Sequence, residues 1–155
     1  MRPSAAALTD LLYRVEQHRR TLVTEAVMRH GLSFTQWMAL DVLFRLGPCT
    51  MTQLAQASVI DRTSLTRTID GLIARGCVAR STSARDRRAV IVEASLAGQH
   101  LAREVGADVA RLESRLLAAF ETQERDRLAR DLDKLLTSWA LPRPREEVVS
   151  RSRSA

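Results

Sequence analysis

Lysine is almost absent from this chain of 155 residues, in which Lys134 is the only one. Arginine therefore supplies nearly all of the positive charge behind a formal net charge of +6 at pH 7. A basic balance favours a polyanionic partner. Arginine also binds phosphates and guanine edges through two parallel hydrogen bonds, which lysine cannot do. A genome rich in arginine codons would give the same composition without any such role.

Long apolar runs and cysteine clusters are also missing. No stretch of about 18 apolar residues occurs, and the N-terminus lacks the apolar run of a signal peptide. We therefore expect a cytoplasmic protein with no membrane partner. The two cysteines, Cys49 and Cys77, belong to no CxxC or Cys/His cluster, which favours reduced, semi-buried thiols over a disulfide or a metal site. Aromatic residues make up only 4%, so aliphatic side chains must form the core of a single domain.

The residue patterns that accompany catalysis are absent as well. The three histidines, His18, His30 and His100, are dispersed and show no His-x-x-x-His spacing. The sequence contains no G-x-S-x-G motif and no glycine loop suited to phosphate. We therefore expect neither an enzyme nor a cofactor or metal.

The spacing of apolar residues predicts a mainly α-helical fold. Ser33 with Gln36 and Thr50 with Gln53 form capping boxes, and Asp61 is a suitable N-cap. The expected helices cover residues 8–28, 33–46, 51–57, 61–75, 96–120 and 123–139. Residues 77–81 and 89–94 alternate and are rich in β-branched side chains, which predicts a β-hairpin. Residues 142–155 are rich in Pro, Ser and Arg and are expected to be disordered.

The segment from Met51 to Ser95 is the most informative part of the chain. Two short helices joined by a tight turn precede a hairpin, and this combination suits duplex DNA. In the helix at residues 61–75, leucines and isoleucines define a buried face, which leaves short hydroxyls and arginines opposite: Arg62, Thr63, Ser64, Arg67 and Thr68. We expect Arg67 to contact base edges, and Thr63 and Ser64 to contact bases or phosphates. A solvated polar helix face is the alternative.

The hairpin tip carries the second basic group, which consists of Arg80, Arg85, Arg87 and Arg88 beside the single acid Asp86. The negative potential of a DNA minor groove attracts arginine, and the flanking phosphates do so too. We therefore expect Arg85, Arg87 and Arg88 to contact DNA. A charged hairpin tip alone is common on ordinary proteins.

From about Leu11 to Trp139 the chain resembles the MarR (multiple antibiotic resistance regulator) family of winged helix-turn-helix transcription factors. The most specific parts are IDRTSLTRTIDGLIARGCVAR and RDRRAVIVEASLAG, in this order. The resemblance implies that Ser64 and Arg67 lie in the major groove and that Arg87 enters the minor groove. It also implies that Asp70 pairs with Arg88, although an ordinary surface ion pair worth at most about 1 kcal/mol is the alternative. The chain departs from the family pattern at Ser83-Ala84 and at Ala94.

These observations predict a mainly α-helical winged helix-turn-helix protein with three regions. Residues 33–95 form the DNA-binding region, residues 1–32 and 96–141 form a helical dimerisation region, and 142–155 form the tail. The terminal helices carry more apolar surface than a small winged module can cover, which favours a homodimer. We expect a ligand-responsive repressor bound to double-stranded DNA at a pseudo-palindromic operator. A winged-helix module that binds an acidic protein instead of DNA remains an alternative.

The resemblance also implies a cleft for a small aromatic or carboxylate effector between the dimerisation helices and the winged module. Its candidate lining residues are Tyr13, Arg14, His18, Trp37, Met38, Asp41 and Arg45. Arg14 or Arg45 would pair with a carboxylate, and Trp37 would stack on a ring. A core position for Trp37 and solvated arginines are the alternative. A further alternative is a redox sensor that uses Cys49, which follows Pro48 at an expected helix end and could be exposed.

Overall fold

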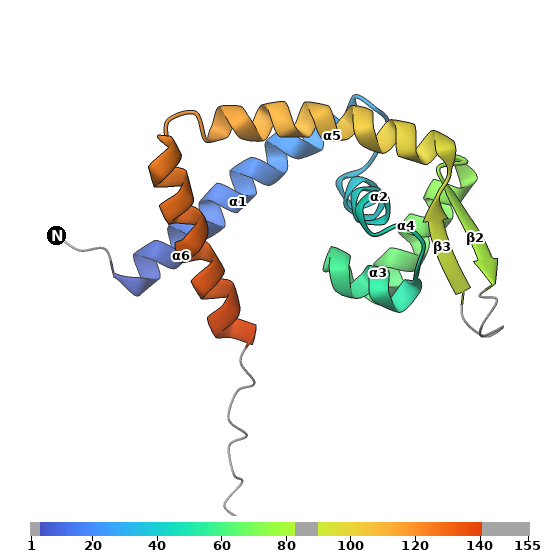
Figure 1. The fold of residues 1–155 in the computed structure, drawn as a ribbon, viewed down its shortest axis with the longest axis horizontal. Helices are drawn as coiled ribbons and strands as arrows, with labels where there is room; N and C mark the ends of the chain where they lie inside the picture. Colours follow the sequence, from blue (N-terminus) through green and yellow to red (C-terminus); the bar gives the residue numbers. More distant parts are fainter. Residues whose placement is uncertain (1–3, 83–89, 141–155) are drawn as a thin grey trace, which may run out of the picture. The chain divides into compact units, whose positions relative to one another are not determined.

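The computed structural model describes residues 4–82 and 90–140, which form six helices and three short strands (Figure 1). In chain order they are α1 (Ala5–Met28), α2 (Phe34–Leu46), β1 (Cys49–Thr50), α3 (Met51–Ser58), α4 (Arg62–Ala74), β2 (Val78–Thr82), β3 (Val90–Ala94), α5 (Leu96–Leu116) and α6 (Thr122–Ala140). The predicted fold class, mainly α-helical with a small β-hairpin, is confirmed. The tail at 142–155 lies outside the described residues.

Three helices begin at the N-caps that the sequence predicts. At α2, the Ser33 hydroxyl accepts a hydrogen bond from the Gln36 amide at 3.1 Å, and the Gln36 side chain accepts one from the Ser33 amide at 3.0 Å. Thr50 and Gln53 form the same reciprocal pair at the start of α3. The Asp61 carboxylate caps α4 by accepting a hydrogen bond from the Ser64 amide at 2.9 Å. These caps satisfy amides that have no partner inside the helix.

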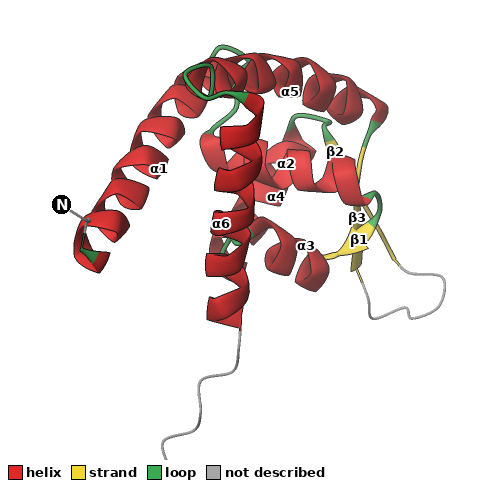
Figure 2. Cartoon of the chain, turned by 60° about the vertical axis from the view of Figure 1, so that its left-hand side comes forward, coloured by secondary structure: helices red, strands yellow, loops and turns green. Residues whose placement is uncertain are grey.

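The hairpin is part of a three-stranded antiparallel sheet with the order β1-β3-β2 (Figure 2). Val78 pairs with Ala94 and Thr82 with Val90, so the described parts of the hairpin stay in register along their whole length. Strand β1 was not predicted, because two residues are too few to show an alternating pattern. It pairs Cys49 with Val92 and thereby joins the start of the helix-turn-helix to the hairpin.

The chain divides into two compact units, Met1–Leu116 and Leu117–Ala155. The core of the first unit is formed mainly by aliphatic side chains from α1 to α5 and the sheet, among them Val27, Leu40, Leu54, Leu72 and Val105. Both cysteines are buried in this core. The expectation that Cys49 could be exposed is therefore wrong: its strand lies against β3, and burial raises the pKa of its thiol.

Both ends of the chain expose apolar side chains. In the first half of α1, Leu8, Leu11, Leu12 and Val15 are between 42% and 65% exposed. In the second unit, α6 exposes four leucines to a similar degree: Leu128, Leu132, Leu135 and Leu136. Helix α5 ends at Leu116 rather than near Phe120 as predicted, and Phe120 also is exposed. Among the described helices, none combines the length and the apolar character needed to cross a membrane.

A tight junction connects the start of α5 with the end of α4 and the start of β2. Gly76 has a φ of +69°, which ends the α4 segment and turns the chain into β2. The Ser95 amide donates to the Cys77 carbonyl at 3.0 Å, and the Ser95 hydroxyl donates to the Gly76 carbonyl at 2.6 Å. The same hydroxyl accepts a hydrogen bond from the Gly98 amide at 3.0 Å, as an N-cap does. A Cβ atom on Gly98 would lie 1.9 Å from the Cys77 carbonyl oxygen, so only glycine fits.

Replacing Gly98 with alanine tests this junction. Because the obstructing atom belongs to the backbone, the first turn of α5 must move, and we expect a loss of about 2–4 kcal/mol in the free energy of unfolding. Gly106→Ala is the matched control in the same helix, since its Cβ would lie 3.5 Å from Trp37 Cη2, an ordinary contact. Helix propensity favours that control by about 0.5–1 kcal/mol. Equal stabilities of the two variants in urea unfolding would contradict the close approach at Gly98.

Candidate nucleic-acid interface and ligand pocket

Helices α3 and α4 form a helix-turn-helix whose turn carries a strained residue. Val59 at the end of α3 has a φ of +54°, in the left-handed region that β-branched residues rarely adopt. Its side chain is 89% exposed. On its N-terminal side, the buried Ser58 hydroxyl donates to the Leu54 carbonyl at 2.6 Å. The turn therefore holds Val59 in a backbone conformation that its β-branched side chain disfavours.

Helix α4 separates an apolar face from a polar face. Leu65, Ile69 and Leu72 are fully buried. On the opposite side four of the five predicted residues are exposed, namely Arg62, Thr63, Ser64 and Arg67. A shallow depression on this face is lined by Arg62, Thr63, Thr66 and Arg67. Thr66 was not predicted, although it lies one turn after Arg62 and follows the same spacing.

Thr68 does not belong to the exposed face, so its predicted role as a DNA contact is corrected. Its side chain is only 9% exposed. The hydroxyl donates to the Ser64 carbonyl at 2.7 Å, which satisfies the buried group within the helix. Thr68 follows Leu65 by three residues and precedes Leu72 by four, and this spacing places it on the apolar stripe.

The polar residues at the start of α4 also affect the titration of its cap. Hydrogen bonds from the side chain and the backbone amide of Ser64 hold the pKa of Asp61 below its usual range. The carboxylate is thus stabilised in its charged form at the positive end of the helix dipole.

Helix α4 is attached to the hairpin through an ion pair with the middle of β2. Asp70 Oδ1 lies 2.9 Å from Arg80 Nη1, and Arg80 belongs to β2. The sequence predicted Arg88 as the partner of Asp70. Arg88, like Arg85, Arg87 and Ser83-Ala84, falls in the segment 83–89, outside the described residues. Arg80 was identifiable only as part of the basic group, because the register of the hairpin decides which arginine faces α4.

A pocket of about 350 Å³ lies among α1, α2, α5 and the end of α3. Four of the predicted cleft residues line it: Trp37, Met38, Asp41 and Arg45. Trp37 is only 7% exposed, so it belongs to the core and the pocket wall at once. The remaining lining residues include Arg19, Val23, Val59, Gly106, Val109 and Glu113.

The three residues predicted on the first helix do not line this pocket. Tyr13 is 63% exposed, and Arg14 pairs loosely with Asp10 at 3.9 Å. His18 is also exposed. The reason is geometric, since the buried positions of α1 begin only at Val23. Arg19, which lies one turn before Val23, lines the pocket instead and was not predicted.

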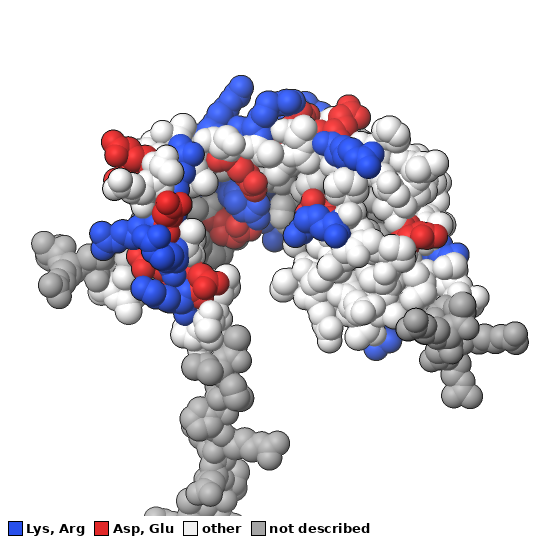
Figure 3. All heavy atoms as spheres, viewed as in Figure 1, with Lys and Arg blue, Asp and Glu red and all other residues white. Residues whose placement is uncertain are grey.

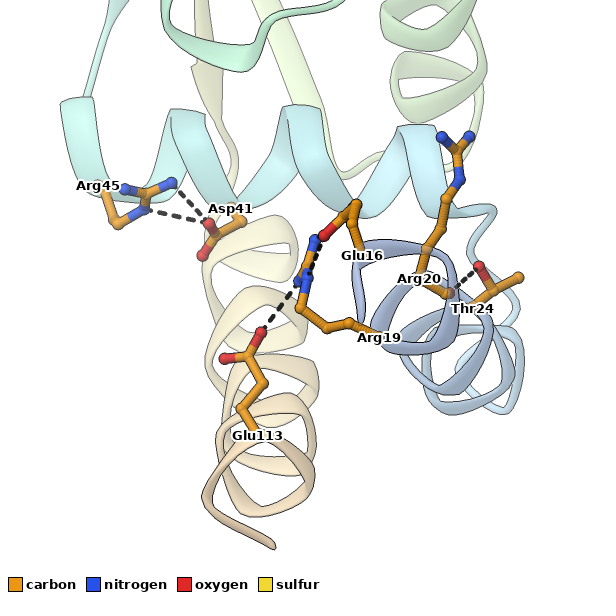
Figure 4. Close-up of polar contacts among 7 residues, drawn as sticks. All are labelled: Glu16, Arg19, Arg20, Thr24, Asp41, Arg45 and Glu113. Atoms are coloured by element: carbon orange, nitrogen blue, oxygen red, sulfur yellow. Dashed lines mark hydrogen bonds and ion pairs between the residues drawn. The ribbon is translucent and has the colours of Figure 1, made fainter. Parts of the chain in front are cut away.

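Ion pairs hold the charged groups of the pocket in place (Figure 4). Arg45 donates to one Asp41 oxygen from both Nε, at 3.1 Å, and Nη2, at 2.8 Å. Arg19 lies between Glu16 and Glu113, and this arrangement connects α1 with α5. Hydrogen bonding to Glu16 raises the pKa of Arg19, and the same bond lowers the pKa of Glu16. On the face shown in Figure 3, basic and acidic atoms lie side by side in several places.

A second polar network joins the end of α4 to α5. The Arg75 guanidinium donates to the carbonyls of His30 and Gly31 in the loop after α1. The His30 ring lies 2.8 Å from Asp108 and 3.6 Å from Glu104, both on α5. Its hydrogen bond holds the pKa of Asp108 below the usual value. Helix α4 is thus connected to α5 through this network as well as through the Gly98 junction.

Comparison with known proteins gives matches along most of the chain. The model of the MarR family matches residues 30–89. A probable transcriptional regulator from Pseudomonas aeruginosa is 29% identical, with a TM-score of 0.73 over 83% of this chain and 96% of that chain. A cysteine-to-serine mutant of MarR from E. coli, solved with operator DNA, is 25% identical, with a TM-score of 0.76 over 83% and 93%. BpsR from Bordetella bronchiseptica, whose DNA binding is regulated by 6-hydroxynicotinic acid, has a similar fold at 24% identity, with a TM-score of 0.75 over 83% and 98%.

Substitution of Asp61 tests the cap of α4. Because the pKa of Asp61 is lowered in the folded protein, its charged form adds stability above the unfolded pKa, and this contribution disappears as the pH falls through the folded value. We expect Asp61→Ala to lower the Tm at pH 7. Asp61→Asn is the control, because asparagine caps a helix without a titrating charge. The difference in Tm between wild type and Asp61→Asn should stay constant above about pH 5 and shrink as the pH falls below about pH 4, and a difference that stays constant through this acidic range would exclude the charge of Asp61 as its source.

Proposed function

The chain belongs to the MarR family of winged helix-turn-helix transcriptional regulators, and on this basis we propose that it is a ligand-responsive repressor. It binds double-stranded DNA as a homodimer, at an operator that is a pseudo-palindrome, because a two-fold symmetric protein fits two inverted half-sites. The observation that carries the proposal is the polar face of α4, which exposes Arg62, Thr63, Ser64 and Arg67. The opposite face of the same helix is packed in the core, and Asp70 joins the helix to β2.

In this proposal α4 is the recognition helix and enters the major groove. The short side chains of Thr63 and Ser64 let the backbone approach the groove, and the N-terminal amides of the helix favour phosphate. Arg67 projects beside them, three residues after Ser64, and contacts a guanine edge through two hydrogen bonds. Thr66 joins this surface because it lines the same depression.

The hairpin is the wing in this proposal. Arg85, Arg87 and Arg88 contact the minor groove and its phosphates, as the resemblance to the family implies. The Asp70–Arg80 ion pair supports this role, since it joins the recognition helix to the first strand of the wing. Both side chains are partly exposed, so the pair contributes at most about 1 kcal/mol.

The homodimer rests on the exposed apolar side chains at the two ends of the chain. Residues 1–32 and 96–141 form the dimerisation region, and residues 33–95 form the DNA-binding region. Burial of Leu8, Leu11, Leu12 and Val15 of α1 and of the leucines of α6 against a second copy removes apolar surface from water. Contiguous exposed apolar residues of this kind mark association surfaces on soluble proteins.

The pocket beside Trp37 is the proposed effector site. A volume of about 350 Å³ suits a small aromatic molecule, and Trp37 offers an aromatic surface at its wall. The pocket contacts α1 and α5 as well as Val59 in the helix-turn-helix. A bound effector therefore favours one arrangement of the dimer helices relative to the recognition helix and shifts the population away from the DNA-binding state.

Substitution of Arg67 tests the base-contacting role. Arg67→Ala should weaken binding to the operator by about 1–3 kcal/mol and relax the preference at particular base pairs. Arg67→Lys is the matched variant, because it keeps the charge and loses the two-pronged geometry. It should keep the salt dependence of binding while losing the sequence preference, as measured by fluorescence anisotropy on operator and scrambled duplexes. Equal weakening on both duplexes would assign Arg67 to the phosphates.

Weak, salt-insensitive DNA binding by the wild type would favour a protein-interaction module instead.

A further inference from the structure

The proposed effector pocket holds as many carboxylates as guanidinium groups. Arg19 and Arg45 line it, and so do Asp41 and Glu113. Each arginine already has a carboxylate partner within 3.1 Å. An effector with a single carboxylate therefore meets positive charges that are already neutralised, and it must displace a carboxylate of the protein to gain an ion pair.

The two carboxylates on Arg19 occupy different edges of its guanidinium group. Glu16 accepts from Nε at 2.8 Å and from Nη2 at 3.1 Å, which uses the side edge. Glu113 accepts from Nη1 at 3.1 Å, at the end of the group (Figure 4). A guanidinium offers paired donors on both of these edges. The end edge is the remaining place where a ligand carboxylate could bind Arg19 in the two-pronged way, and Glu113 already accepts a hydrogen bond from Nη1, one of its two donor groups.

Glu16 and Glu113 also differ in where they come from. Glu16 lies three residues before Arg19 in α1, the spacing of a local helix pair, and does not line the pocket. Glu113 comes from α5 and lines the pocket together with Arg19. Arg20, the next residue of α1, points away from both of them and covers the Phe34 ring at 4.7 Å. Glu113 is therefore the carboxylate that an acidic effector would displace.

We propose that Glu113 determines the specificity of the pocket by acting as an internal carboxylate that disfavours aromatic monoacids relative to their uncharged amides. This inference rests on the proposed effector site. The Arg19 and Glu113 side chains are 36% and 43% exposed, and pairing at such a site changes an equilibrium by at most about fivefold. Removal of the repulsion between Glu113 and the ligand carboxylate adds to this, so the total effect of Glu113 is about 5- to 10-fold.

Isothermal titration with a matched pair of probes tests the role of Glu113. The probes are 6-hydroxynicotinate and its uncharged amide, 6-hydroxynicotinamide, which differ in charge and hardly in shape. We expect Glu113→Gln to bind the acid about 5- to 10-fold more tightly than the wild type does, with the affinity for the amide changed by less than about twofold. Glu113→Ser should show the same gain for the acid. A loosened α1–α5 contact would instead change both affinities alike.

Two further variants separate the charge of Glu113 from other effects. Glu104→Gln removes the same charge from an exposed position earlier in α5, outside the pocket lining, and should leave the preference between the probes unchanged. Adding Arg19→Gln to Glu113→Gln should abolish the gain for the acid, because the gain depends on the freed guanidinium. An acid affinity that does not rise in Glu113→Gln, while the amide binds, overturns the role of Glu113 and leaves the effector site standing. Failure of both probes to bind any of the proteins overturns the effector site and this inference together.

Discussion

The close approach of α5 to the Cys77 carbonyl is the constraint on which the other parts of the structure depend. Gly98 permits it, and Ser95 secures it with hydrogen bonds to both Gly76 and Cys77. The end of α4, the first strand of the hairpin and the first turn of α5 therefore meet at one point. Because protein interiors are close-packed, a displacement of α5 is transmitted to α4 rather than absorbed at this junction. The His30–Asp108 and Arg75 contacts link the same helices a second time.

Under the proposed function, this arrangement lets a ligand bound between the helices control the DNA-binding surface without touching DNA. The pocket lining combines Arg19 and Glu113, which hold α1 to α5, with Trp37 of the core and Val59 of the helix-turn-helix turn. In the proposed mechanism, a ligand bound beside the Arg19–Glu113 contact alters the relation between α1 and α5, and the Gly98 junction passes that change to α4. In the proposed homodimer, the ligand would therefore change the distance between the two α4 helices.

Much of the fold could be predicted from the sequence, because its signals are local. The caps at Ser33, Thr50 and Asp61 were all identified correctly. Features that depend on tertiary packing were not identified correctly. Thr68 was placed on the wrong face, since a hydroxyl that bonds its own helix can be buried. Tyr13, Arg14 and His18 were preferred to Arg19, because only the tertiary structure shows where α1 first meets α2 and α5. The Asp70–Arg80 ion pair was not predicted, because the register of the hairpin decides which side chain faces α4, whereas the expected partner Arg88 lies outside the described residues.

The central claim is that two copies of the chain present their α4 helices to two half-sites on one side of the DNA. Hydroxyl-radical footprinting of the operator with the full chain tests it most directly. The account predicts two protected half-sites with inverted symmetry, with their centres about 10 base pairs apart or a multiple of one helical turn. A single protected half-site, or uniform protection with no symmetry, would contradict it.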